Sequence, residues 1–278
     1  MDFFLNENQQ ELSALSRRVL SDRVTEDRLR EIEASGDRFD PALWADLASA
    51  GILAAALPES LGGAGLGLLE QCSVLAEIGR AVAPAPYLAS IVLGAGALAR
   101  FGTPDQQRRW AGPAGRGEIV LTAALSEEDG DDPRAPAVSA ERMKGAGRWL
   151  LSGAKTAVLA GPVADLTLVP ATTPEGVAVF LVAPTDDAVT VQRQQLTDGA
   201  SAGRLVLAGV ALPDERVLGS AAAGAEITDW LVARATVGLC ALQFGVVERA
   251  LELTVRSEER RVGKECRALC RSRWSPYH

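Results

Sequence analysis

Residues 87–125 read YLASIVLGAGALARFGTPDQQRRWAGPAGRGEIVLTAAL, and the pattern of the sequence changes within this stretch. Its first part places apolar residues at the spacing of a helix, from Leu88 to Leu98. Thr103 and Gln106 then predict a helix start, because each side chain can bond the other's backbone amide. From Ile119 onward the apolar residues form short runs rich in aliphatic side chains, which is typical of strands. The sequence therefore predicts helices before residue 119 and a sheet after it.

Apolar residues upstream of this stretch also recur at helical intervals. One stripe is formed by Leu12, Leu15 and Val19, and the apolar positions from Leu68 to Gly79 form another. Between them, Asp40-Pro41 provides a capping side chain and a fixed φ at the start of a further helix. LGGAGLG (61–67) lacks the GxGxxG pattern of a dinucleotide-binding turn, so we interpret it as a loop. Residues 1–118 are thus predicted to form an N-terminal helical domain.

Downstream, short apolar runs are separated by clusters of Gly, Pro, Asp and Thr. Because such close spacing is typical of strands joined by tight turns, we expect residues 119–215 to form a middle domain, an antiparallel β-barrel. A long apolar helix is predicted from about Ala222 to Val255, with the face from Ile227 to Leu251 turned inward. Residues 216–255 would be the first part of a C-terminal helical domain, and the fold class is α+β. The expected strands cover 119–125, 148–151, 166–170, 177–183, 189–193 and 204–211.

The composition changes abruptly at Arg256. Residues 256–278, RSEERRVGKECRALCRSRWSPYH, carry seven basic and three acidic residues in a chain whose net charge is −8. RSEERRVGKEC resembles the conceptual translation of a sequencing adapter, so we expect 256–278 to be a non-native tail and the natural chain to be truncated after Val255. A genuine basic terminus that binds a partner is the alternative.

Charge and hydropathy exclude several classes of protein. A chain with a pI of about 4.9 lacks the basic surface that binds nucleic acid, so no nucleic-acid partner is expected. We also expect no membrane span, because no uninterrupted apolar run reaches the roughly 18 residues required. The start MDFFLNENQQ is polar and does not look like a secretory signal, which favours a cytoplasmic location.

The cysteine and histidine content limits the chemistry further. The four cysteines lack the clustering of metal ligands, so we expect reduced thiols and no metal site. Cys72 and Cys240 lie in apolar helix stripes and are expected in the core. The single histidine, His278, belongs to the tail, so residues 1–255 have no histidine base, triad or metal ligand. A histidine-dependent hydrolase is thereby excluded.

Six segments together resemble the acyl-CoA dehydrogenase family, in the same order and spacing. They cover essentially all of residues 1–255. The resemblance depends on all six segments occurring in the order and at the spacing found in the family. The segments are LPESLGGAGLGLLE (57–70), FGTPDQQRRW (101–110), LTAALSEEDGDD (121–132), LSGAKTAVLAGPVADLTLVPA (151–171), RLVLAGVALPDERVLG (204–219) and GVVERALELTV (245–255).

The resemblance implies a flavin-dependent oxidation. Members of the family convert an acyl-CoA thioester to the trans-2-enoyl thioester, with FAD as the cofactor and an electron-transfer flavoprotein-like acceptor. A carboxylate removes the α-proton while a hydride leaves the β-carbon, so the base must be desolvated to be effective. In this chain the usual catalytic Glu would lie beyond Val255, and no catalytic residue is assigned within it. The family also implies a homo- or hetero-oligomer with a related subunit.

Two strips of the sequence resemble the family's flavin-binding segments. The first contains Ala123, Leu125, Ser126, Gly130 and Asp131, and it retains a hydroxyl at Ser126 but has Asp131 where a Ser would face phosphate. A carboxylate beside a pyrophosphate is repulsive. An ordinary acidic loop between strands is the alternative for this strip.

The second strip, GAKTAVL (153–159), places Ala157, Val158 and Leu159 beside the cofactor. Where the resemblance predicts an aromatic side chain, this chain has Ala157. Where it predicts a hydroxyl, this chain has Leu159. These changes weaken the flavin site, since one neutral hydrogen bond is worth about 0.5–1.5 kcal/mol. A plain β-strand is the alternative.

For the substrate, the resemblance places Thr236 where the family often carries an Arg next to acyl-CoA. Arg234, two residues away, is the candidate contact for CoA phosphate, with an exposed salt-bridging Arg as the alternative. Two functional classes remain. One is an acyl-CoA dehydrogenase subunit whose companion supplies the better flavin site, and the other is a non-catalytic scaffolding paralogue.

Overall fold

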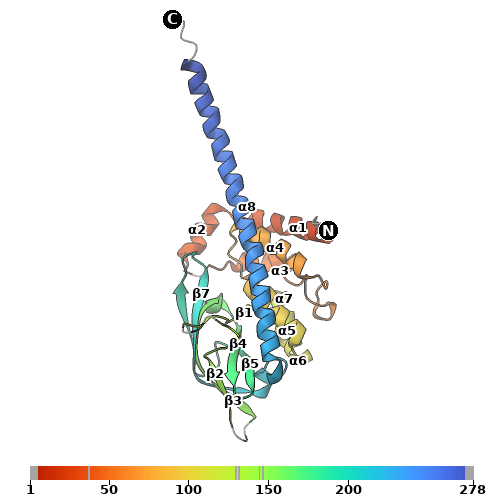
Figure 1. The fold of residues 1–278 in the computed structure, drawn as a ribbon. Coiled ribbons are helices and arrows are strands. Elements are labelled where there is room, and N and C mark those ends of the chain that lie inside the picture. The colour runs from red at the N-terminus through yellow and green to blue at the C-terminus, as the bar shows by residue number, and fades with distance from the viewer. Residues whose placement is uncertain are drawn as a thin grey trace.

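The computed structural model describes residues 6–36, 38–128, 130, 132–143, 145 and 147–272, with side chains described up to residue 255. Figure 1 shows a group of helices above and beside a curled sheet, with one long helix, α8, running along both. The order of elements is helices, strands and then α8, which confirms the α+β fold class.

Short helices make up the N-terminal part. The bounds are α1 Glu7–Arg23, α2 Glu26–Ala34, α3 Pro41–Ser49, η1 Glu59–Leu61, α4 Leu68–Ala81, η2 Leu88–Ala95, α5 Gly96–Phe101, α6 Pro104–Gln106, η3 Gln107–Ala111 and α7 Gly112–Gly115. Here η1 is a 3-10 turn, whereas η2 and η3 are π-helical segments continuous with their neighbours.

The predicted caps are present. Asp40 accepts hydrogen bonds from the amides of Ala42 and Leu43, and Pro41 occupies the first turn of α3. Thr103 and Gln106 form a reciprocal capping box at α6. The stripe predicted for α1 was wrong at Leu15, which is exposed, because the inward face follows Leu12, Ser16 and Leu20.

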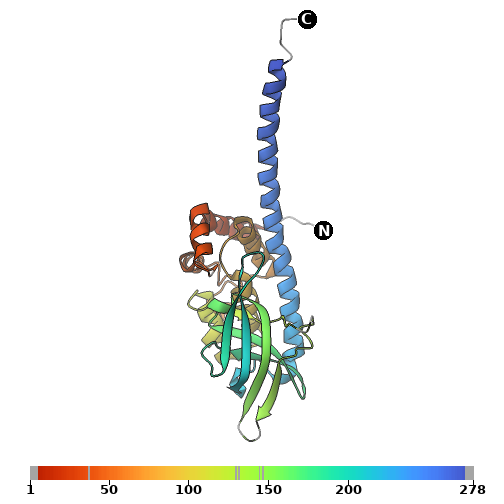
Figure 2. The same cartoon turned by 90° about the vertical axis from the view of Figure 1, so that its left-hand side faces the viewer.

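Seven strands form one mixed sheet. They are β1 Leu121–Ala123, β2 Ser139–Met143, β3 Arg148–Leu159, β4 Leu166–Thr173, β5 Gly176–Val182, β6 Val189–Gln195 and β7 Ser201–Pro213. The order is β1-β4-β2-β3-β7-β6, with β5 on β4. Figure 2 shows that the sheet is curled, and its inner face buries a hydrophobic cluster of its own.

The expectation of a purely antiparallel sheet was wrong. β1 and β2 both pair with β4 in parallel, through Leu121↔Leu166 and Ser139↔Thr172. The prediction assumed that strands close together in the sequence pair with each other. β1 instead pairs with β4, and β2 and β3 lie between them in the sequence. Strand β2 was missed because its sequence SAERM is polar and four of its five residues are exposed.

Two hydrophobic cores meet at β4. Leu168 packs with the helices, whereas its neighbour Val169 points into the curl of the sheet. Inside the curl, Trp149 and Phe180 contact edge to face with ring centroids 5.5 Å apart. Burial on both faces explains why β5 is a continuous apolar run and why β4 is mostly apolar, with Thr167 buried among its apolar residues.

Helix α8 runs from Gly224 to Ser272, past the predicted limit at Val255, and the 3-10 turns η4 Gly161–Val163, η5 Asp214–Arg216 and η6 Ala221–Ala223 precede it. It packs on α4, η2 and β5. Ile227 and Leu231 are buried as predicted, but Leu239, Val247 and Leu251 are exposed, as is Cys240. The predicted inward face is therefore fully buried near its start, whereas farther along only the line of Leu242, Gly245 and Val246 is covered, where α8 packs against α4.

The expectation of no membrane span stays a prediction, although one helical segment passes a test of length and composition. The helical segment Ala221–Val255 contains an 18-residue window with a mean hydropathy of 1.6, which is long and apolar enough to cross a bilayer. Only 17% of that window is buried. The criterion of an uninterrupted apolar run misses this segment because isolated charged residues divide it.

Candidate functional site

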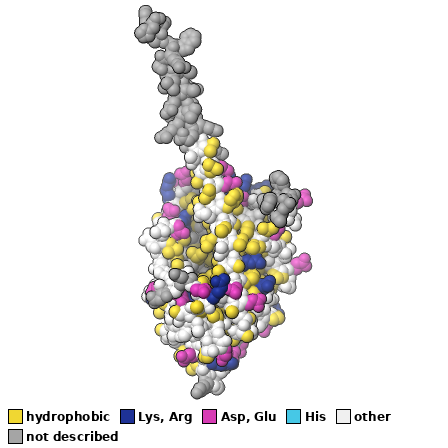
Figure 3. All heavy atoms as spheres, viewed as in Figure 1, with side chains coloured by type: hydrophobic (Ala, Val, Ile, Leu, Met, Phe, Trp, Pro, Cys, Tyr) yellow, Lys and Arg dark blue, Asp and Glu magenta, His cyan; other side chains and the backbone are white. Residues whose placement is uncertain are grey.

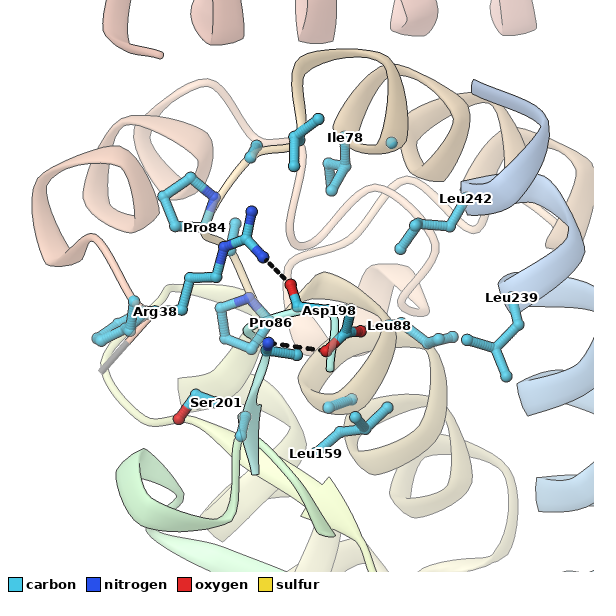
Figure 4. A pocket seen from close by; sticks show the side chains of 18 of the residues that line it. Arg38, Ile78, Pro84, Pro86, Leu88, Leu159, Asp198, Ser201, Leu239 and Leu242 are labelled. Carbon is cyan, nitrogen blue, oxygen red and sulfur yellow. Dashed lines mark hydrogen bonds between the residues drawn. The ribbon is translucent and has the colours of Figure 1, made fainter. Parts of the chain in front are cut away.

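An apolar cavity of about 370 Å³ lies where the helices, the sheet and α8 meet. Figure 4 shows Ile78 at the top of it, Leu88 beside Leu239 and Leu242 of α8 on the right, and Leu159 at the end of β3 below. This volume is within the range of small-molecule sites, about 300–1,000 Å³. A site built from three separate parts of the chain requires the whole fold to form it.

One wall of the cavity is polar. Arg38 Nη1 donates to the backbone oxygen of Asp198 (2.6 Å), and the Asp198 carboxylate accepts the amide of Ala200 (2.8 Å). The buried Ser201 Oγ has no hydrogen-bond partner in the described part of the chain. Arg38, Ala200 and Ser201 also border a second cavity of about 540 Å³, which Gln194 lines as well. The apolar cavity thus adjoins a polar one.

The two predicted flavin strips lie side by side. An isolated bridge pairs Ser126 with Thr156, whose amide donates to the Ser126 backbone oxygen (2.9 Å). The Ser126 side chain is exposed, and its hydroxyl makes no hydrogen bond with the described residues. Thr122 Oγ1 donates to the Leu159 backbone oxygen (2.6 Å), which joins the two strips a second time. The structure therefore brings the two strips together, and their role in binding a flavin stays a prediction.

A β-bulge interrupts the second strip. The register between β3 and β7 shifts between Lys155 and Val158, and Ala157 has a φ of 48°. The bulge removes the Ala157 amide from the ladder, and this amide donates instead to Gln194 Oε1 (2.8 Å). A left-handed conformation is unusual for a residue with a Cβ atom and marks a position that its surroundings hold in place.

A buried ion pair fixes the loop that follows Ser126. Lys155 Nζ lies 2.6 Å from Glu127 Oε1, with both side chains buried, and Glu127 also accepts the amide of Val138 (3.1 Å) and that of Ala137. Burial alone would raise the pKa of Glu127, but the hydrogen bonds from Lys155 and the two amides outweigh it and lower the pKa. Burial lowers the pKa of Lys155, against the opposing effect of Glu127. The pair ties the loop to β3.

The remaining predicted flavin residues lie as follows. Ala123 and Val158 are buried, Leu125 and Leu159 are half-buried, and Gly130 is exposed. Only Leu159 among them lines the apolar cavity. Asp131 lies outside the described residues, so its prediction stands without a structural account.

The two predicted substrate residues do not border the cavities. Arg234 lies over the ring of Trp230 at 4.9 Å, and burial, followed by the charge of Arg100, lowers its pKa. No ion pair between Arg234 and a carboxylate is seen among the described residues, so the contact with Trp230 takes the place of the salt bridge considered as the alternative. Thr236 is exposed, and its hydroxyl donates to the Val232 backbone oxygen (2.9 Å). Neither residue is brought together with the flavin strips.

Sequence reasoning missed Arg38, Gln194 and Ser201. Each owes its position to contacts between segments far apart in the chain, and no local pattern marks any of them. Among the described residues, no group of His, Cys, Asp and Glu is placed to hold a metal ion.

Comparison with known proteins places the chain in a family. Residues 6–118 match the model "Acyl-CoA dehydrogenase, N-terminal domain". The chain is 42% identical to a subunit of the ChsE4–ChsE5 complex from Mycobacterium tuberculosis, with a TM-score of 0.86 over 92% of this chain and 68% of that one. The chain belongs to the acyl-CoA dehydrogenase family. FAD is the cofactor of this family, as in the FADH2 complex of a Mycobacterium smegmatis glutaryl-CoA dehydrogenase, which shares the fold (22% identity, TM-score 0.81).

Two further members of the acyl-CoA dehydrogenase family are informative. "Acyl-CoA dehydrogenase FadE27" of Mycobacterium tuberculosis is 43% identical over 255 residues, which is 91% of this chain and 65% of FadE27. A variant of the Tcur3481–Tcur3483 steroid ACAD is 39% identical, with a TM-score of 0.82 over 89% of this chain and 65% of that one. The chain thus spans just under two thirds of the length of FadE27.

The flavin strips offer groups that suit FAD. The hydroxyl of Ser126, the hydroxyl of Thr156 and the bulge amide of Ala157 are hydrogen-bonding groups on the two paired strips, and Gln194, which bonds two of them, lines the polar cavity. Such groups match the carbonyl and imide groups of the isoalloxazine ring. The residues present therefore fit the cofactor, although Gln194 already bonds two of them.

Proposed function

We propose that the protein is a subunit of an FAD-dependent acyl-CoA dehydrogenase that converts a bulky acyl thioester to its trans-2-enoyl product. The apolar cavity beside Leu159 carries this proposal, because it would hold an acyl chain next to the flavin strips. The naming of one relative as a steroid ACAD supports a bulky alicyclic acyl group. The cytoplasm is the compartment that suits such an enzyme.

The chain's own residues would bind and orient the reactants. Ser126, Thr156 and Ala157 would bond the ring of FAD, and Leu159, Leu239 and Leu242 would exclude water from the acyl chain. When bound, FAD accepts the hydride that leaves the β-carbon. Gly130 and Asp131 would face the pyrophosphate, and Arg234 and Thr236 remain proposed contacts of the CoA portion.

The proton-abstracting carboxylate would come from outside the described residues. Asp198 is the only carboxylic residue bordering the apolar cavity within them, and its carboxylate accepts the Ala200 amide. A catalytic base must be desolvated and free to accept a proton. The Asp198 carboxylate is not free in this sense, because it is bonded to the Ala200 amide. We therefore propose that residues absent from this chain or a companion subunit supply the base, and that an electron-transfer flavoprotein-like protein reoxidises the flavin.

Reconstitution tests the proposal. The chain, co-expressed with a homologous neighbouring subunit, should give a yellow complex whose visible flavin absorption bleaches on addition of a bulky acyl-CoA. Leu239→Trp would fill the cavity from an exposed position on α8 and should abolish bleaching by the bulky substrate while sparing a short one. Val237→Trp is the matched control, because Val237 is similarly exposed on α8 but does not line the cavity. A colourless complex, or a yellow complex that no acyl-CoA bleaches, would refute the proposal.

A scaffolding role is the second candidate, and Leu159 favours it. The hydroxyl that the family resemblance leads one to expect at this position is absent, and Gln194 occupies the amide of Ala157. As a scaffolding subunit, the chain would stabilise a flavin-binding companion subunit without binding flavin itself. Flavin content decides between the two roles, since a scaffolding subunit would contribute no FAD to the complex.

A further inference from the structure

The side chain of Gln194 holds the bulge of β3 by a paired contact. Its Oε1 accepts the Ala157 amide (2.8 Å), and its Nε2 donates to Thr156 Oγ1 (2.9 Å). The Thr156 hydroxyl also lies 3.3 Å from Oε1. The carboxamide therefore presents an acceptor and a donor side by side to two consecutive residues.

This contact is not part of the sheet ladder. Gln194 belongs to β6, which is separated from β3 by β7, and it reaches Ala157 across the small residues Ala202 and Gly203 of β7. The polar cavity of about 540 Å³ lies beside it, so the side chain has room to move away. Nothing in the sheet requires Gln194 to stay where it is.

A carboxamide and the pyrimidine edge of a flavin share one hydrogen-bonding pattern, a carbonyl next to an N–H group. The Ala157 amide has a single proton and can donate to one acceptor at full strength. We infer that Gln194 is an internal competitor for FAD, which occupies the donor and acceptor at Ala157 and Thr156 until the cofactor displaces it. The inference rests on the proposed function, because it assumes that the second strip lies against the flavin.

Removal of the competitor tests the inference. Gln194→Ala in this subunit of the co-expressed complex should bind FAD about three- to tenfold more tightly, since the wild type must first break one or two hydrogen bonds. Flavin fluorescence titration measures the dissociation constant. Gln192→Ala is the matched control, because Gln192 lies two residues earlier on the same face of β6, is exposed, and should leave the affinity unchanged.

Hydrogen–deuterium exchange of residues 156–158 gives a readout specific to this subunit. Without FAD, the Ala157 amide should exchange slowly in the wild type and faster in Gln194→Ala, and FAD should slow it again in the variant. Equal or weaker FAD affinity of a folded Gln194→Ala variant would overturn the inference alone. If the flavin titration and the exchange data show no FAD binding to this subunit in wild type or variants, the proposed function fails and the inference with it.

Discussion

At the scale of single residues, the buried pair Lys155–Glu127 makes the loop after Ser126 dependent on one charge interaction. Both side chains are almost fully buried, and the carboxylate accepts two backbone amides in addition to the lysine. Removing one member of such a pair leaves an uncompensated charge, whereas replacing both members is far less costly. The pair is therefore a sensitive point of the fold beside the flavin strips.

Glu127→Gln should lower the free energy of unfolding by about 3 kcal/mol, because Lys155 would stay buried without its counter-charge. Lys155→Met combined with Glu127→Gln should recover a large part of that loss. Urea denaturation of the single and double variants measures both values. Additive losses in the double variant would show that the two residues act independently.

Asp40 links stability to pH on the acidic side. Its hydrogen bond from Arg28 lowers the pKa of Asp40, burial opposes the shift, and the amides of Leu43 and Ala42 reinforce it. A carboxyl group with a lowered pKa stabilises the fold above its unfolded pKa of about 3.9, and the contribution is lost as the pH falls through the folded value.

We expect Asp40→Asn to flatten the loss of stability at acidic pH while retaining the cap oxygen of α3. Denaturant midpoints measured from pH 6 down to about pH 3 test this. Asp22 is exposed, and its side chain makes no hydrogen bond or ion pair with the part of the chain that the structure describes, so Asp22→Asn provides the control. An unchanged pH profile in Asp40→Asn would contradict the assigned role.

At the scale of elements, α4 and α8 approach each other closely through glycines. A Cβ atom on Gly245 would lie 1.9 Å from the Ala76 backbone oxygen, and one on Gly79 would lie 2.0 Å from that of Leu242. Neither contact can be relieved by a side-chain rotation, because the atoms belong to the backbone. The two helices also border the apolar cavity, so their separation sets its width.

Gly245→Ala should therefore force the helices apart and lower the free energy of unfolding by about 2 kcal/mol or more. Thermal denaturation measures the change. Val247→Ala, on the exposed face of the same helix, should have little effect. Equal stability of Gly245→Ala and the wild type would show that α8 packs differently from the arrangement described.

The sequence predicted well those features that depend on residues close together in the chain. The caps at Asp40 and Thr103 depend on residues within three positions, so their patterns are visible in the sequence. Strand β2 and the parallel pairing of β1 depend on partners far along the chain, and their residues carry no local signal. The same holds for the site, where Leu159 was predicted but Arg38, Gln194 and Ser201 were not. The domain boundaries at 118, 215 and 255 stay predictions.

At the scale of the whole molecule, the outer face of α8 exposes many apolar side chains to water. Figure 3 shows hydrophobic side chains gathered along this helix. Its exposed apolar residues include Val237, Leu239, Phe244, Val247 and Leu251. A continuous apolar surface of this kind on a water-facing helix favours association.

The 278-residue chain should therefore self-associate or bind a hydrophobic dye when it is purified alone. Replacing Phe244, Val247 and Leu251 with Gln should reduce both, because these side chains are more than half exposed and leave the cores untouched. Size-exclusion chromatography with light scattering, together with dye fluorescence, measures the change. Replacing the exposed polar residue Gln243 with Ala serves as the control for altering the same helix. If the unmodified chain is a monomer that binds no dye, the apolar face of α8 is covered in solution by contacts that this structure does not contain.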